Sequence, residues 1–141
     1  MRIVGGKFKG RHLTAPRGKT IRPTSERVRE SLFNILAHAG LAHDVPKGFA
    51  VLDAFAGTGA LGLEALSRGA ARVTFIEKDH RAIRLIRENT ISLKQMEHVL
   101  ILKRDATRPG VPPLEHNLAF LDAPYHGAFT RLALKHFAKG G

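Results

Sequence analysis

The chain contains no cysteine, which excludes disulfide bridges and thiolate metal sites and leaves no basis for redox chemistry by the chain itself. It has no run of about 18 apolar residues, and its N-terminus lacks an apolar segment of signal-peptide length. Its eight histidines do not pair with carboxylates at metal-ligand spacing. These absences predict a soluble, cytoplasmic protein with no metal site and no membrane partner.

Acidic residues are scarce: 12 Asp and Glu stand against 23 Lys and Arg, giving a net charge of +11 and a pI near 10.9. The first 25 residues hold no acid. Their cations are Arg2, Lys7, Lys9, Arg11, Arg17, Lys19 and Arg22. This clustering indicates a polyanionic partner, and we predict that these residues contact RNA. A merely solubilising surface is the alternative, and a membrane surface is disfavoured because the segment lacks an amphipathic helical stripe.

The hydrophobic pattern predicts one α/β domain. The 141 residues, 43% of them hydrophobic, suit a single core that buries roughly two-thirds of the unfolded surface. Strands are expected at 50–54, 72–77, 99–103 and 118–122, and helices at 59–68, 79–93 and 129–138. This order implies a parallel sheet with helices on both faces and a ligand at the carboxyl ends of the strands.

Two smaller elements are predicted before the sheet. Apolar alternation broken by glycines suggests a hairpin from Arg2 to Leu13, and Thr24 or Ser25 can cap a following helix. The expected apolar face of that helix carries Val28, Leu32, Ile35, Leu36 and Ala39, and its charged face carries Arg27, Arg29 and Glu30. We therefore divide the chain into a basic RNA-contacting arm at 1–23 and a core at 24–141.

A glycine loop follows the first predicted strand and opens the next helix. Gly57 and Gly59 allow a sharp turn that brings backbone N–H groups close to a ligand at the positive end of the helix. With Gly62, their spacing also fits the dinucleotide fingerprint. Asp53 at the strand tip would repel a pyrophosphate but can accept hydrogen bonds from a cationic amino-acid group, which favours S-adenosylmethionine over NAD.

An acidic residue stands at or just past the end of each predicted strand: Asp53, Glu77, Asp105 and Asp122. Glu77 has the reach to accept both ribose hydroxyls, and Asp105 can accept from an adenine amino group while Ala106 supplies a backbone N–H. A solvated strand-end acid and a turn-forming Asp are the respective alternatives. The predicted cofactor residues are Asp53, Phe55, Gly57, Thr58, Gly59, Glu77, Lys78, Asp105 and Ala106.

The residues from Asp122 to Tyr125 carry the predicted catalytic chemistry. An exocyclic base amine is hard to methylate because its lone pair is delocalised into the ring. The Asp122 carboxylate and the Ala123 carbonyl can each accept one amine hydrogen and aim the nitrogen, and Pro124 biases Ala123 toward an extended conformation. Tyr125 is predicted to stack on a flipped-out base. An ordinary strand-ending turn with a core tyrosine is the alternative.

Three segments together resemble the bacterial 16S ribosomal RNA guanine-N2 methyltransferases: Arg22–Leu36, Leu52–Gly59 and Phe120–Tyr125. The resemblance runs from Met1 to about Gly127. It implies a Rossmann-like methyltransferase domain with an N-terminal hairpin against RNA, S-adenosylmethionine as cofactor, and a target guanine in 16S rRNA, in the small ribosomal subunit or its assembly intermediate. The alternatives are an adenine-N6 DNA methyltransferase, since an acid-x-Pro-Tyr turn also suits that amine, and a catalytically silent RNA-binding or ribosome-assembly module.

Two features depart from the family's pattern. Ala123 occupies the place of the first of two prolines, and the chain ends at Gly141, where the family's sheet continues through further strands. We therefore expect the last strands to be missing and strand 118–122 to form an apolar edge. We expect either marginal stability or self-association through this exposed edge.

Overall fold

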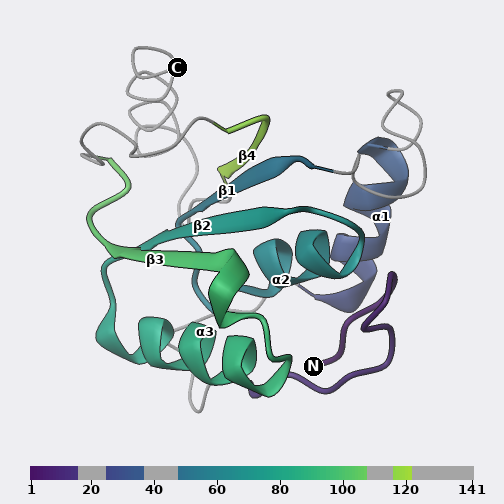
Figure 1. Ribbon diagram of the computed structural model, residues 1–141, viewed down its shortest axis with the longest axis horizontal. Coiled ribbons are helices and arrows are strands. Elements are labelled where there is room, and N and C mark those ends of the chain that lie inside the picture. Colours follow the sequence, from purple (N-terminus) through teal and green to yellow (C-terminus); the bar gives the residue numbers. More distant parts are fainter. Residues whose placement is uncertain (16–24, 37–47, 108–115, 122–141) are drawn as a thin grey trace.

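The computed structural model describes residues 1–15, 25–36, 48–107 and 116–121. They contain a four-stranded parallel sheet in the order β3-β2-β1-β4 (Figure 1). The strands are β1 (Ala50–Ala54), β2 (Arg72–Glu77), β3 (Val99–Lys103) and β4 (Leu118–Leu121). The chain moves outward from β1 to β3 and then crosses to the other side of β1, so the strand order reverses between β1 and β4. In α/β proteins, such a reversal opens a ligand crevice at the carboxyl ends of the strands.

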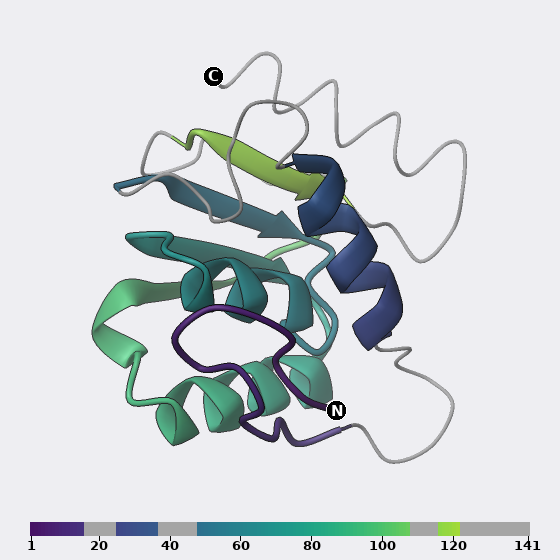
Figure 2. The ribbon, with the colours of Figure 1, turned by 90° about the vertical axis from the view of Figure 1, so that its right-hand side faces the viewer.

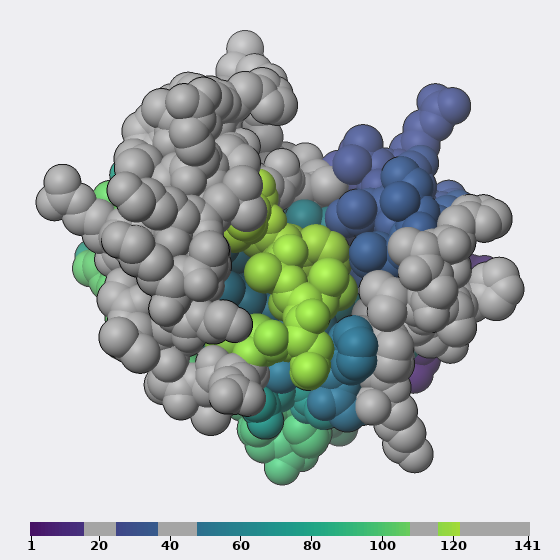
Figure 3. Space-filling view, turned by 90° about the horizontal axis from the view of Figure 1, so that it is seen from above, coloured from purple at the N-terminus to yellow at the C-terminus, as the bar shows by residue number. Residues whose placement is uncertain are grey.

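The ends of the first, second and fourth strands meet at one edge of the sheet. Ala54 at the end of β1 pairs with Leu121 of β4 on one side and with Ile76 of β2 on the other. This confirms the predicted juxtaposition of the strand ends. Among the described residues β4 is an outer strand, and part of it lies at the surface beside α1 (Figure 3). Self-association through this edge stays a prediction.

Three α-helices lie on the same face of the sheet: α1 (Glu26–Leu36), α2 (Ala60–Ser67) and α3 (His80–Ser92) (Figure 2). The main core joins Phe33 of α1, Leu63 of α2 and Ile86 of α3 to the sheet residues Phe75 and Phe120. A smaller cluster on the opposite face contains Leu52, Ala54, Ile76 and Ala106. The predicted helix 129–138 lies outside the described residues. None of the described helices has the length and hydrophobicity required to cross a membrane.

Most predicted boundaries are confirmed to within one residue. Strands β1, β2 and β3 have the predicted bounds, and α2 and α3 begin and end one residue inside theirs. A short 3₁₀ helix, η2 (Met96–His98), precedes β3. The predicted caps are present: the Asp79 carboxylate accepts from the N–H groups of Arg81 and Ala82, and the Ser25 hydroxyl accepts from Val28 N at 3.2 Å.

The predicted faces of α1 are only partly confirmed: Leu32 and Leu36 pack against the core and Arg27 and Glu30 are exposed, but three other residues lie on the wrong face. Arg29, which was assigned to the charged face, is completely buried together with Phe33. Val28 and Ile35, which were assigned to the apolar face, are 55% and 63% exposed. The helix is therefore rotated relative to the prediction. The cause is a buried carboxylate on α2 that draws an arginine into the interface, which hydrophobic periodicity cannot indicate.

The N-terminal residues form a small antiparallel hairpin with a single bridge between Arg2 and His12. Its turn is fixed against the last residue of α2, because the Ser67 hydroxyl donates to Gly5 O at 2.6 Å and accepts from Phe8 N at 2.9 Å. Gly6 has a φ of 78°, and a Cβ there would lie 2.0 Å from the carbonyl oxygen of Ser67. Glycine fits here because it adopts a positive φ readily and has no Cβ to collide with Ser67.

Candidate functional site

The loop between β1 and α2 has an unusual backbone. Phe55, Gly57 and Gly59 all have positive φ, at 56°, 57° and 79°. Gly59 is the N-cap residue of α2, and a Cβ there would lie 2.9 Å from Ile86 Cγ1. The chain thus turns back at the strand end and starts the helix directly beneath it, as the glycine spacing predicted.

Two carboxylates accept hydrogen bonds from backbone N–H groups of this loop and of the first turn of α2. The Asp53 Oδ2 atom accepts from Gly62 N at 3.0 Å, and Asp53 is only 1% exposed. The Glu77 Oε1 atom accepts from Gly57 N at 2.8 Å. The other oxygen of Glu77 accepts from the N–H groups of Lys78 and Asp79, at 3.0 and 2.9 Å. The ends of β1 and β2 are therefore connected to the glycine loop through their acids.

In the loop after β3, the carboxylate of Asp105 binds groups of the same loop. Asp105 Oδ1 accepts from both the backbone N–H and the hydroxyl of Thr107, at 2.9 and 2.7 Å. Ala106 is 4% exposed and packs with Leu52, Ala54 and Ile76, so this loop lies against the ends of β1 and β2. Asp105 thus forms a turn here, and its adenine role stays a prediction.

The remaining predicted site residues differ in exposure. Thr58 is buried, with its hydroxyl 3.4 Å from Ala60 N, Phe55 is half-buried and Lys78 is exposed. The predicted catalytic residues Asp122, Ala123, Pro124 and Tyr125 follow β4 in the sequence and lie outside the described residues. Within the described ranges, no group of three or more His, Asp or Glu side chains is arranged to hold a metal ion.

The predicted RNA residues of the hairpin lie away from the glycine loop. Arg2, Lys7, Lys9 and Arg11 are exposed, whereas Arg17, Lys19 and Arg22 are outside the described residues. Arg2 pairs with Glu26 at 3.4 Å. The hairpin turn contacts Ser67 at the C-terminal end of α2, and the glycine loop adjoins the N-terminal end of the same helix. An RNA that contacts both must extend along the molecule.

A buried charge cluster was not predicted from the sequence. The Glu64 carboxylate of α2, fully buried, accepts from Val4 N at 3.0 Å, Gly5 N at 2.9 Å and Arg68 Nε at 3.0 Å. It also lies 3.6 Å from Nε of Arg29. Burial lowers the pKa of the Arg29 guanidinium, and the charge of Glu64 opposes this.

This cluster connects three elements. Arg29 of α1 donates from Nη2 to the carbonyl oxygen of Arg2 at 2.5 Å, and Arg68 lies over the ring of Phe33. A signal was present in the sequence: Glu64 is the one charged residue of an otherwise nearly apolar helix. Such an acid is seldom buried without a partner.

Replacing Gly62 by alanine is expected to destabilise the protein. A Cβ at this helical position would lie 2.4 Å from Phe75 Cε1 and 2.8 Å from Val73 Cγ1. Overpacking costs about 1–3 kcal/mol, which exceeds the roughly 0.5–1 kcal/mol that alanine gains over glycine in a helix. Urea unfolding measures the difference, and an increase in stability would contradict the close packing of α2 on β2.

The parallel sheet, its reversed strand order and the acids around the glycine loop define a Rossmann-like methyltransferase fold. Residues 1–139 match the family model described as Conserved hypothetical protein 95, and the chain belongs to this family.

Curated relatives support this assignment. The protein YlbH of Bacillus subtilis (strain 168) is 38% identical over 129 residues, which cover 89% of this chain and 67% of the relative. Ribosomal RNA small subunit methyltransferase D of Escherichia coli (strain K12) is 40% identical over 125 residues, covering 89% of this chain and 60% of that protein. The chain thus spans about three-fifths to two-thirds of the length of these relatives.

Solved structures agree with the sequence relatives. The Escherichia coli protein yhhF superimposes with a TM-score of 0.81 at 35% sequence identity, covering 100% of this chain and 73% of that structure. This similarity shows that the two chains share their fold.

Proposed function

We propose that this chain transfers a methyl group from S-adenosylmethionine to the exocyclic N2 amine of a guanine in 16S ribosomal RNA. The substrate would be the small ribosomal subunit or its assembly intermediate in the cytoplasm. Support comes from the name of the Escherichia coli relative, a ribosomal RNA small subunit methyltransferase, and from the match of Asp122–Tyr125 to an amine-aiming loop.

One observation supports this cofactor in particular. The N–H groups of Gly57 and Gly62, which a dinucleotide pyrophosphate would need, already bind the carboxylates of Glu77 and Asp53. A second anion would meet two negative charges there. A ligand with a cationic amino-acid group and neutral ribose hydroxyls instead complements this edge, so the residues fit S-adenosylmethionine and disfavour NAD.

Different residues at this edge of the sheet would bind different parts of the cofactor. Glu77 accepts three backbone hydrogen bonds, and since a carboxylate offers about four acceptor positions, one ribose hydroxyl can bind without displacing any of them. A second hydroxyl would replace the Gly57 donor. Asp53 would attract the amino group, and Asp105 and Ala106 would adjoin the adenine. The bound cofactor supplies an electrophilic methyl group on its sulfonium.

The reaction requires the chain to orient the guanine amine. In our proposal the Asp122 carboxylate and the Ala123 carbonyl each accept one amine hydrogen, which points the nitrogen at the donor, while Tyr125 stacks on the base. This proposal is supported by the end of β4, where Leu121 pairs with Ala54 at the edge that carries the glycine loop.

A methylation assay tests this function. Labelled cofactor is offered with undermethylated small subunits, naked 16S rRNA and duplex DNA, and the product nucleosides are identified. We expect N2-methylguanosine from one of the two RNA substrates. Label in DNA as N6-methyladenine would support the adenine alternative instead. A silent RNA-binding module would bind RNA but give no heat with S-adenosylmethionine in calorimetry.

The hairpin cations are expected to contribute to RNA binding. Changing Lys7, Lys9 and Arg11 together to alanine should weaken binding and make the plot of log affinity against log salt shallower by about 2, since each phosphate contact contributes roughly 0.7–0.9. Binding is measured by fluorescence anisotropy over a salt series. If the slope stays the same, the hairpin does not contact phosphates.

A further inference from the structure

The solvent side of α3 is strongly basic. Its buried side consists of Ala82, Ile83, Ile86, Asn89 and Thr90. The exposed side carries Arg81, Arg84 and Arg87, which follow one another at three-residue spacing. In the part of the chain that the structure describes, none of the three arginines takes part in an ion pair; the pairs found there include those of Arg29 and Arg68 with Glu64.

This arrangement of charge does not stabilise the helix. Arg81 lies in the first turn, where the positive end of the helix dipole disfavours a cation, and the last turn has no basic residue. Cations three residues apart also repel each other. A helix selected only for stability or solubility would place these charges differently, whereas a polyanion bound along this side would compensate for their repulsion.

The hairpin extends this basic surface. The Arg11 Nη2 atom donates to Ser92 O at 2.9 Å, and Thr14 and Asn89 exchange two hydrogen bonds, so the second half of the hairpin is fixed along α3. Figure 2 shows the hairpin in front of α2 and α3. The guanidinium of Arg11 is thereby placed at the C-terminal end of the helix that carries the three arginines.

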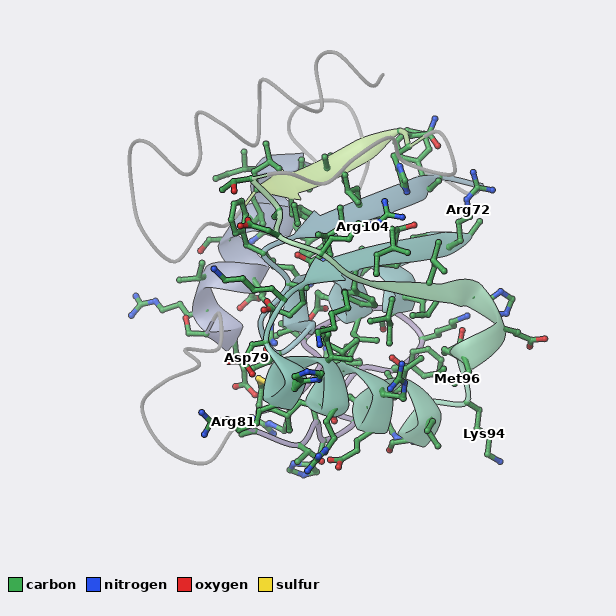
Figure 4. The ribbon with its side chains drawn as sticks, turned by 90° about the vertical axis from the view of Figure 1, so that its left-hand side faces the viewer. Arg72, Asp79, Arg81, Lys94, Met96 and Arg104 are labelled. Carbon is green, nitrogen blue, oxygen red and sulfur yellow. The ribbon has the colours of Figure 1, made fainter. Side chains whose placement is uncertain are left out.

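The other end of the surface reaches the candidate cofactor site. Asp79, the cap of α3, donates its N–H to Glu77 at 2.9 Å, and Arg81 comes two residues later. Asp79 and Arg81 lie together at one end of α3, and Lys94 lies at the other (Figure 4). The 13 residues of α3 span about 20 Å, so this surface bridges the gap between the glycine loop and the hairpin.

We propose that the exposed side of α3, with Arg81, Arg84, Arg87 and the hairpin residue Arg11, binds the sugar–phosphate backbone of the RNA substrate. The proposal rests on the proposed function and specifies the side from which the RNA approaches. Guanidinium groups suit this partner because they bind phosphate oxygens with two parallel hydrogen bonds. The RNA then runs from the target base at the sheet edge along α3 to the hairpin.

Two variants that each remove one positive charge, one on this surface and one away from it, test the proposal. Arg84→Gln on α3 is compared with Arg72→Gln, which removes one charge at the corner of the molecule away from Arg81 (Figure 4). We expect Arg84→Gln to weaken binding to a 16S rRNA fragment by about threefold and Arg72→Gln to leave it unchanged. Changing Arg81, Arg84 and Arg87 together to glutamine should weaken binding at least tenfold and reduce the salt slope by about 2.

Glu88 provides the opposite test, because it is the one acid on the exposed side of α3. Glu88→Gln should strengthen RNA binding by about twofold. Cofactor affinity should stay at its wild-type value in all variants, and the melting temperature of the triple arginine variant should be no lower than that of wild type, because the repulsion is relieved. Equal effects of Arg84→Gln and Arg72→Gln, or no effect of the triple variant, would overturn the proposal. These binding data do not depend on turnover, so they are separate from a failure of methyl transfer, which would overturn the proposed function.

Discussion

Replacing Glu64 by leucine is expected to destabilise the protein by about 3–5 kcal/mol, because it leaves the buried Arg29 without its counter-charge. The N–H groups of Val4 and Gly5 also lose their acceptor, and each unsatisfied buried donor costs about 1–3 kcal/mol. These costs overlap, since all of these groups share one carboxylate. Urea unfolding followed by circular dichroism measures the loss.

Two further variants test whether the loss of stability comes from the buried ion pair of Glu64 and Arg29. Glu97→Gln removes an acid whose side chain is 80% exposed, and it should change stability by no more than about 0.5 kcal/mol. The double variant Glu64→Leu with Arg29→Met replaces the buried pair by apolar groups, and it should recover part of the loss. A Glu64→Leu protein within about 1 kcal/mol of wild type would show that the charge cluster does not hold the hairpin and α1 on α2.

Replacing Asp122 by alanine is expected to reduce methyl transfer at least about 100-fold while leaving the affinity for S-adenosylmethionine unchanged. The physical reason is that the amine loses one of the two acceptors that aim it. Single-turnover methylation with saturating RNA gives the rate, and calorimetry gives the cofactor affinity. Turnover close to the wild-type rate would remove Asp122 from the proposed mechanism.

Glu77→Gln is the matched variant at the neighbouring strand end. It should weaken cofactor binding, since Glu77 is proposed to accept the ribose, and its rate at saturating cofactor should fall less than that of Asp122→Ala. A loss of cofactor affinity in Glu77→Gln and a loss of rate in Asp122→Ala would assign cofactor binding to Glu77 and orientation of the guanine amine to Asp122. A parallel loss of cofactor affinity in both variants would indicate that Asp122 also belongs to the cofactor site.

The sequence was sufficient to predict the sheet. The mostly apolar runs Val51–Ala54 and Val73–Ile76 are short, buried on both sides and bounded by turns, so both their extent and their parallel order could be predicted. The glycine loop was equally predictable, because glycine adopts the positive φ of Gly57 and Gly59 without steric cost; the positive φ of Phe55 in the same loop was not predicted.

The contacts between distant segments could not be predicted. One of the three backbone N–H groups that donate to Glu77 belongs to the glycine loop, and a contact with the backbone cannot be predicted from the pattern of side chains. The burial of Arg29 depends on Glu64, which lies on another helix, while periodicity compares residues only within one helix. Both cases concern polar groups whose position is decided by a partner remote in the sequence.

The hairpin is attached to α2 largely through its main chain. The N–H groups of Val4, Gly5, Lys7 and Phe8 and the carbonyl of Gly5 make these hydrogen bonds. Peptide groups are the same in almost every residue, so the side chains of Lys7 and Lys9 are available for redesign without loosening the attachment. Under the proposed RNA role of the hairpin, changing the side chains of this turn would alter the nucleic-acid preference while its attachment to α2 is kept.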